Sequence, residues 1–187
     1  MGEMEEWGIV LDYLPRGKST STSPEPLVQI LGYNHFTILE AVVRRGVEVA
    51  VGEKVYVGRG ERNKIDHIKG RISYYELTGA GKAELDNAVE RIVKEREADF
   101  VNFFNKCGAV TIRLHQLELL PGIGKKHMGD ILREREKRPF TSFADIKERV
   151  ALLPDPTKLV RDRILTELRG ESRYYILTRP PYKRKEG

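Results

Sequence analysis

The sequence has little of several residues on which common functions depend. It contains one cysteine, Cys107, in 187 residues, which excludes an internal disulfide and a zinc site built from several cysteines. Its four histidines lack the spacing of metal ligands. No apolar run approaches the ~20 residues of a membrane span, and the acidic start MGEMEEWGIV does not resemble a secretory signal. We therefore expect a cytoplasmic protein without membrane association or resident metal, with Cys107 as a small buried apolar residue.

Charge is abundant but unevenly distributed. Charged residues make up 33% of the chain, hydrophobic residues 40%, and the net charge is +5. Residues 1–80 carry 10 Lys and Arg against 11 Asp and Glu, whereas residues 111–187 carry 18 against 11. A polyanion would therefore be attracted first to the C-terminal part of the chain.

The first 80 residues have the pattern of a small β domain. Five short segments are rich in β-branched and aromatic residues and are separated by Gly, Asn and Pro. The polar loop at 15–26, which contains Arg16 and Lys18, follows the first of them. Without a second layer, such strands cover their apolar face by curling. We predict a five-stranded OB-like β-barrel over residues 1–80, with strands at 8–14, 27–33, 36–43, 53–58 and 71–77.

The hydrophobic period changes after Gly79. Apolar residues in the segment 81–106 recur three or four apart with charges between them, which predicts one amphipathic helix or two in succession. We therefore assign residues 81–110 to connecting helices. The phenylalanines at 100, 103 and 104 either pack in the core or form a binding face.

The segment LELLPGIGKKHMGDIL, residues 117–132, predicts a helical hairpin. Leucines at 114, 117 and 120 have helical spacing up to Pro121, which cannot continue a helix. Gly122 and Gly124 tolerate the positive φ of a tight reversal, and a second helix starts after them. The unpaired N–H groups at the start of that helix favour an anion such as phosphate, and Lys125 and Lys126 add positive charge.

A second hairpin follows at an offset of 33 residues. LLPGIGKKHMGDIL at 119–132 and LLPDPTKLVRDRIL at 152–165 share six of fourteen positions, which indicates an internal repeat. Asp155 replaces the first glycine and is predicted to cap a helix that begins at Pro156 and ends near Gly170. Lys158 takes the place of Lys125, either as a phosphate contact or as a solvated charge. Residues 111–170 would form an all-α domain of paired hairpins, followed at 171–187 by a strand-like segment and a basic tail, Lys183 to Lys185.

The first hairpin resembles the helix-hairpin-helix motif of nucleic-acid-binding proteins that do not read sequence. The resemblance rests on Gly122, Ile123 and Gly124, with Ile123 as the apolar residue that points into the core. It implies phosphate binding, with a monovalent cation bridging at Gly122 to Gly124. One difference is Met128, where the motif usually has Ala.

The whole chain resembles an archaeal family called domain of unknown function 655. The resemblance implies an OB-like barrel followed by a helix-hairpin-helix domain, and an archaeal source. Genes of that family tend to lie near genes for translation and rRNA modification, which favours RNA over DNA.

The segments that could carry catalysis lack the necessary residues. ELTGAGKAE at 76–84 has Glu76 and Ala83 where a P-loop needs Gly and Ser or Thr. Helix-hairpin-helix glycosylases carry a catalytic Asp downstream of the hairpin, and the matching segment 132–140 has none. We therefore predict a non-enzyme; a nuclease or base-modifying enzyme would require distant carboxylates or histidines to converge.

These features together predict a monomeric protein that binds nucleic acid, RNA in preference to DNA, through backbone phosphates and without reading sequence. The predicted binding residues are Gly122, Ile123, Gly124, Lys125, Lys126, Lys158, Arg16 and Lys18. Tyr56 or Tyr74 would stack bases on the barrel, next to Arg59 and Arg62. The alternative is a protein-interaction module of a translation or transcription assembly, which predicts an exposed apolar patch and little effect of neutralising the two lysines.

Overall fold

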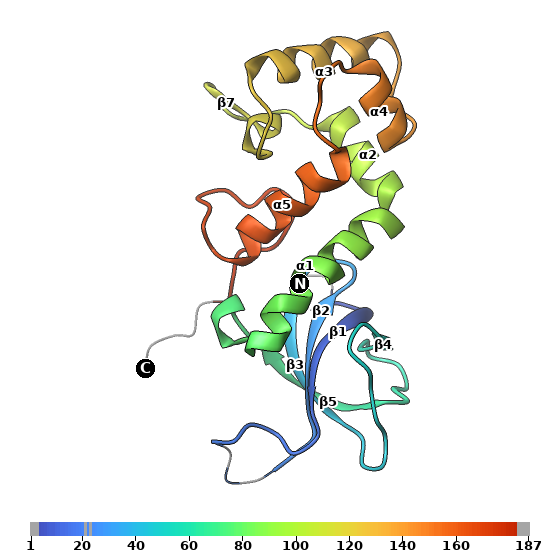
Figure 1. Cartoon of the computed structure of the whole chain (residues 1–187), viewed down its shortest axis with the longest axis vertical. Coiled ribbons are helices and arrows are strands. Elements are labelled where there is room, and N and C mark those ends of the chain that lie inside the picture. The colour runs from blue at the N-terminus through green and yellow to red at the C-terminus, as the bar shows by residue number, and fades with distance from the viewer. Residues whose placement is uncertain (1–3, 21, 23, 183–187) are drawn as a thin grey trace. The chain divides into compact units, whose positions relative to one another are not determined.

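The structure is a computed structural model, described for residues 4–20, 22 and 24–182. Over these residues the chain is mixed α+β, with a five-stranded antiparallel sheet, a two-stranded ribbon and five α-helices (Figure 1). It divides into two compact units: a sheet unit, Met1–Ala88 with Glu167–Gly187, and a helical unit, Val89–Thr166. The basic tail, Lys183 to Lys185, lies outside the described residues.

The sheet unit is built on an antiparallel sheet with the strand order β4-β1-β2-β3-β5. A shift in register between Val10 and Asp12 of β1 marks a bulge, which increases twist and helps the sheet to curl. The core contains Val10, Val28, Ile30, Ala41, Val55 and Ile65, all almost fully buried. The strands are β1 (Trp7–Leu14), β2 (Leu27–Gly32), β3 (Ile38–Val43), β4 (Lys54–Tyr56) and β5 (Ile65–Arg71).

The sheet is a curled half-barrel rather than the predicted closed barrel. The described residues form no ladder between the edge strands β4 and β5, and β4 has only three residues. The predicted strand at 71–77 is wrong, because the fifth strand is Ile65–Arg71 and a 3-10 turn follows at Tyr74–Glu76. There the Glu76 carboxylate accepts from the amide of Ser73 at 2.8 Å, so a local capping box outweighs the β propensity of the two tyrosines.

The connecting segment forms two helices in succession, α1 (Gly79–Glu95) and α2 (Glu97–Lys106), as the period predicts. The buried side chains of α2 are Phe100, Val101 and Phe104. Phe104 is fully buried, and its ring meets that of Phe143 with centroids 6.4 Å apart. Phe104 and Phe143 therefore pack in the core of the helical unit. Cys107 is buried, as expected.

The helical unit continues with short elements and three helices. They are β6 (Ala109–Thr111), β7 (Leu114–His115), the 3-10 turn η2 (Gln116–Leu119), α3 (Lys125–Lys137), α4 (Phe143–Arg149) and α5 (Pro156–Leu168). Ser142 caps α4 by accepting from the amide of Asp145 at 2.9 Å. The predicted α-helix before Pro121 is wrong, because this segment is a 3-10 turn with Leu120 as its C-cap. Leu117 and Leu120 are three residues apart, a spacing at which side chains of a 3-10 turn face the same side.

The last turn of α5 anchors the chain beyond it. Oε1 of the fully buried Glu167 accepts from the amides of Leu177 at 3.1 Å and Thr178 at 2.9 Å, and from the Thr178 hydroxyl at 3.1 Å. The strand expected in the segment 171–187 is absent from its described part, which extends to Tyr182. A buried carboxylate, rather than a sheet ladder, pairs these amides.

Candidate nucleic-acid interface

The first hairpin is a tight reversal between η2 and α3. The amide of Ile123 donates to the carbonyl of Leu120 at 3.1 Å, and Gly122 between them has φ of 96°. Gly124 has φ of −94° and ψ of −179°, so it is extended and any residue could adopt its backbone conformation. Of the two glycines predicted to need positive φ, only Gly122 does.

The start of α3 leaves polar groups available to a ligand. Gly124 is its N-cap and its carbonyl accepts from the amide of Met128 at 3.0 Å, but no side chain caps the helix. Among the described residues, the amides of Gly124, Lys125 and Lys126 find no hydrogen-bond acceptor. Lys125 and Lys126 are exposed and form no ion pair within the described chain. Free amides and two unpaired ammonium groups thus lie within one helical turn.

The two hairpins pack against each other. A Cβ at Gly122 would lie 3.4 Å from Cδ2 of Leu159 and 3.6 Å from Cγ of Pro154, so the first reversal rests on the second. Ile123 is 8% exposed and contributes to the core, as expected. Lys158, exposed and free of ion pairs over the described residues, directly precedes Leu159. Lys158 is thus the sequence neighbour of a residue that contacts the first hairpin, and its own side chain is directed to solvent.

The second hairpin differs in its chemistry. A side-chain oxygen of Asp155 accepts from the amide of Thr157 at 3.0 Å, and the Asp155 carbonyl accepts from that of Leu159 at 3.0 Å. Asp155 therefore caps α5, and Pro156 is its first residue, as predicted. Because its own carboxylate occupies an amide of the first turn, this hairpin is a poorer anion site than the first.

The reversal before α5 places a leucine in an unfavourable conformation. Leu152 has φ of 61° and is 90% exposed. A second apolar side chain of the helical unit, Ile112, is fully exposed between β6 and β7. Apolar side chains of this size are usually buried, but Leu152 and Ile112 are exposed to solvent in the helical unit.

One residue of this region was missed by sequence analysis. Arg163 on α5 is only 5% exposed, and its Nη1 donates to the carbonyl of Leu119 at 3.4 Å, at the end of η2. The sequence does contain a feature that could have identified Arg163: it is a charged residue on the apolar face of α5, between Val160 and Ile164.

His115 belongs to the support of the hairpin. Its Nδ1 accepts from the amide of Leu117 at 3.1 Å, and its own amide donates to Glu118 at 2.7 Å. Burial, and secondarily the nearby Arg135 guanidinium, lower the pKa of His115, although Glu118 acts in the opposite direction. At neutral pH the ring is therefore an uncharged helix cap rather than a cation for phosphate.

We expect His115 to make the helical unit less stable as the pH falls below about 6.5, the ordinary pKa of histidine. Because the pKa is lowered by folding, the unfolded chain binds more protons below that value. The stabilisation is thus complete above it and is lost as the pH falls through the lowered pKa. The variant His115→Asn keeps a capping acceptor but does not titrate. Urea unfolding at about pH 7.5 and about pH 5.5 should show a smaller pH effect in the variant; an equal effect would contradict this role.

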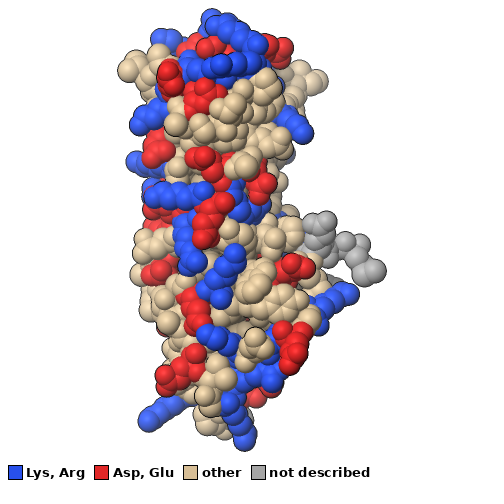
Figure 2. Space-filling view, turned by 90° about the vertical axis from the view of Figure 1, so that its right-hand side faces the viewer, with Lys and Arg blue, Asp and Glu red and all other residues tan. Residues whose placement is uncertain are grey.

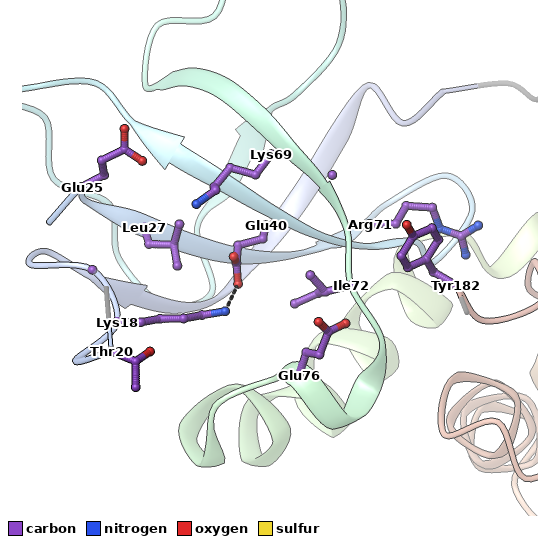
Figure 3. A pocket seen from close by; sticks show the side chains of 12 residues that line it. Lys18, Thr20, Glu25, Leu27, Glu40, Lys69, Arg71, Ile72, Glu76 and Tyr182 are labelled. Atoms are coloured by element: carbon purple, nitrogen blue, oxygen red, sulfur yellow. Dashed lines mark ion pairs between the residues drawn. The ribbon is translucent and has the colours of Figure 1, made fainter. Parts of the chain in front are cut away.

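The two other predicted contacts, Arg16 and Lys18, belong to the sheet unit, whereas the hairpin residues belong to the helical unit. Arg16 is exposed in the β1–β2 loop. Lys18 lines a pocket of about 640 Å³, in which its ammonium pairs with the buried Glu40 at 2.8 Å (Figure 3). The charged residues that line this pocket are Lys18, Lys69, Arg71, Glu25, Glu40 and Glu76. Their balanced charge gives the pocket no preference for a polyanion.

Surface charge is mixed on the face of the molecule shown in Figure 2, where basic and acidic side chains are interspersed. No field of a single sign covers this face. An anion would therefore be bound by local groups, such as the free amides and lysines of the hairpin, rather than by the overall charge of this surface.

Within the described residues, no three His, Cys, Asp or Glu side chains lie together in a way that could hold a metal ion. No helix there is both long enough and apolar enough to cross a membrane.

Comparison with known proteins identifies relatives of this chain in sequence and in structure. A family described as "Protein of unknown function (DUF655)" matches residues 4–179. "Uncharacterized protein MJ0038" of Methanocaldococcus jannaschii is 42% identical over 179 residues, which are 95% of this chain and 81% of that protein. The crystal structure of Af1531 from Archaeoglobus fulgidus, assigned to the same family, has a TM-score of 0.86 and 43% identity, covering 94% of this chain and all of that one. None of these names indicates an enzyme. Both the matched range and the shared fold show that the chain belongs to the DUF655 family.

Proposed function

We propose that this protein binds nucleic acid, RNA in preference to DNA, through backbone phosphates at the first hairpin, and that it does so without catalysis. The observation that carries the proposal is the start of α3, where unpaired amides and the free Lys125 and Lys126 lie together. Such groups bind phosphate but cannot distinguish bases. The preference for RNA rests on the family resemblance.

The finer description of the fold belongs to the same proposal. We infer that α3, α4, α5 and the two reversals form a paired helix-hairpin-helix domain, supported by the contact of Gly122 with Leu159 and Pro154. We infer that the half-barrel is OB-like, supported by its five curled strands. Among the described residues, the carbonyls of Pro121, Gly122 and Ile123 accept no hydrogen bond, which suits a monovalent cation that bridges them to a phosphate.

The test is fluorescence anisotropy with matched single-stranded and duplex RNA and DNA, over a range of salt concentrations. If about four phosphates are neutralised, the logarithm of affinity should fall with the logarithm of salt at a slope of about −3 to −4. In a variant that combines Gly124→Asp, Lys125→Ala and Lys126→Ala, we expect binding to fall by at least about tenfold and the slope to flatten by about 2.

The variant is designed to remain folded. Gly124 has an extended backbone and no atom within 4 Å of an added Cβ, and Asp is a favourable N-cap. Its carboxylate would repel phosphate while stabilising the start of α3. The matched control, Lys106→Ala with Lys147→Ala, removes two exposed lysines of the same unit. If the control loses as much affinity as the hairpin variant, the binding is general electrostatics and the hairpin has no special role.

One observation favours the alternative, a protein-interaction module. Ile112 and Leu152 are exposed apolar residues of the helical unit, and such residues commonly mark protein contacts. This alternative predicts that no oligonucleotide binds with a salt-dependent affinity, and that neutralising the two lysines has little effect on the partner's binding.

A further inference from the structure

Trp7, the chain's only tryptophan, lies at the start of β1 and is 41% exposed. It is directly opposite Tyr56 in the β1–β4 register, and the two rings meet edge to face with centroids 5.3 Å apart. The adjacent pair, Gly8 and Val55, places Val55 in the core. Because side chains alternate along a strand, Trp7 and Tyr56 point to the other side of the sheet.

Tyr33 and Lys54 complete this group. The amide of Tyr33 donates to the carbonyl of Trp7 at 2.8 Å, which brings the end of β2 beside it. Nζ of Lys54 lies 3.8 Å from the ring centroid of Tyr33 and 5.6 Å from that of Trp7. Tyr56 is fixed in place, since its hydroxyl accepts from the amide of Gly60 at 3.0 Å. We call Trp7, Tyr33, Lys54 and Tyr56 the Trp7 surface.

The cations near the Trp7 surface are not neutralised. Lys54, Arg59 and Arg62 form no ion pair among the described residues. Nε of Arg59 instead lies 3.3 Å from Sδ of Met4, and Nε of Arg62 donates to the carbonyl of Gly58 at 2.7 Å. Glu6 and Glu61 are exposed nearby in the sequence, and neither pairs with these cations. An exposed indole is thus accompanied by positive charge that is available to a ligand.

We propose that the Trp7 surface stacks an unpaired base of single-stranded nucleic acid, while Lys54 or Arg59 contacts the adjoining phosphate. A purine or pyrimidine presents a π-face to Trp7, and its phosphate complements the unpaired cations. The contacts to Tyr56 and Lys54 fix the indole in advance, so little side-chain freedom is lost on binding. This contact would select single strands, because bases in a duplex are already stacked. It involves the sheet unit and none of the hairpin residues.

The sole tryptophan gives a direct test. Its fluorescence in the full-length protein is titrated with single-stranded oligo-adenylate and with the duplex of oligo-adenylate and oligo-uridylate. We expect quenching by the single strand and little by the duplex. In anisotropy measurements, Trp7→Leu should weaken binding of the single strand by about tenfold and Trp7→Phe by less. The control Tyr75→Leu removes another exposed aromatic residue of the sheet unit, 69% exposed, and should bind as the wild type does.

The result can be separated from that of the hairpin. Quenching that persists in the Gly124→Asp, Lys125→Ala, Lys126→Ala variant supports the Trp7 surface even if the hairpin proposal fails. Equal quenching by the duplex, or unchanged affinity of a folded Trp7→Leu variant for the single strand, overturns it.

Discussion

Replacing Arg149 with Ala is expected to lower the free energy of unfolding by about 3 kcal/mol, because it removes several hydrogen bonds of a largely buried charged side chain at once, together with its ion pair to Asp145. The side chain of Arg149 is 10% exposed and lies between the end of α3 and α4. Nη2 donates to the carbonyls of Glu134 and Arg138, the latter at 2.9 Å, and Nη1 donates to Asp145 at 3.1 Å. Its Cζ also lies 4.5 Å from the ring centroid of Phe140.

Three features make this arginine hard to replace. In the last turn of α3 the carbonyl of Glu134 accepts only a long bond from the amide of Arg138, at 3.4 Å, so Arg149 supplies it with a second donor and also donates to the carbonyl of Arg138. Its planar fork directs Nη1 and Nη2 to different acceptors in a fixed geometry, whereas a lysine has a single terminal nitrogen. It also contributes, after the backbone amide of Thr141, to the lowered pKa of Asp145.

Urea unfolding of Arg149→Ala beside Arg149→Lys tests this role. The lysine variant keeps the charge but loses the fork, so it should recover less than half of the stability. A shift in the midpoint at an unchanged m value would show that stability itself has changed. Arg149→Lys with wild-type stability would show that charge alone suffices and that the bonds to the α3 carbonyls contribute little.

Glu5→Ala is the second large effect, with an expected loss of about 3 kcal/mol in the free energy of unfolding of the sheet unit. Glu5 is 6% exposed, and its carboxylate accepts from the amides of Asn34 at 2.8 Å, His35 at 2.8 Å and Thr37 at 3.2 Å. These amides belong to the turn between β2 and β3. Without the carboxylate, these amides lose the acceptor that holds the turn in this conformation.

Two further variants sharpen the test of Glu5. Glu5→Gln keeps one acceptor oxygen but turns an NH₂ group toward a donor, so its loss should be intermediate. Gly32→Ala should approach the loss of Glu5→Ala, because an added Cβ would lie only 2.1 Å from Cδ of Glu5 and displace it. Chemical denaturation followed by Trp7 fluorescence reports on this unit. A stable Gly32→Ala variant would mean that the turn tolerates movement of the carboxylate.

Sequence analysis was correct for features that depend on residues close together in the chain. Asp155 with Pro156 gave the start of α5, because a cap is made by residues two or three positions apart. The period after Gly79 gave α1 and α2 for the same reason. By contrast, the leucines before Pro121 have a spacing that also suits a 3-10 turn, and the prediction of a helix there was wrong.

The sequence by itself determined the strand-rich first part, the connecting helices, the reversal at Gly122 and the family resemblance, because each depends on residues close together in the chain. Only the tertiary structure decided which charges are free. It pairs Lys18 of the β1–β2 loop with Glu40 of β3 and leaves Lys125 and Lys126 unpaired. It likewise brings Tyr33 and Lys54 to Trp7, and Arg149 to the end of α3. Ion pairs and ring contacts depend on distances of a few ångströms between segments that strand register and helix packing bring together. These distances cannot be predicted from the residues that flank each side chain in the sequence.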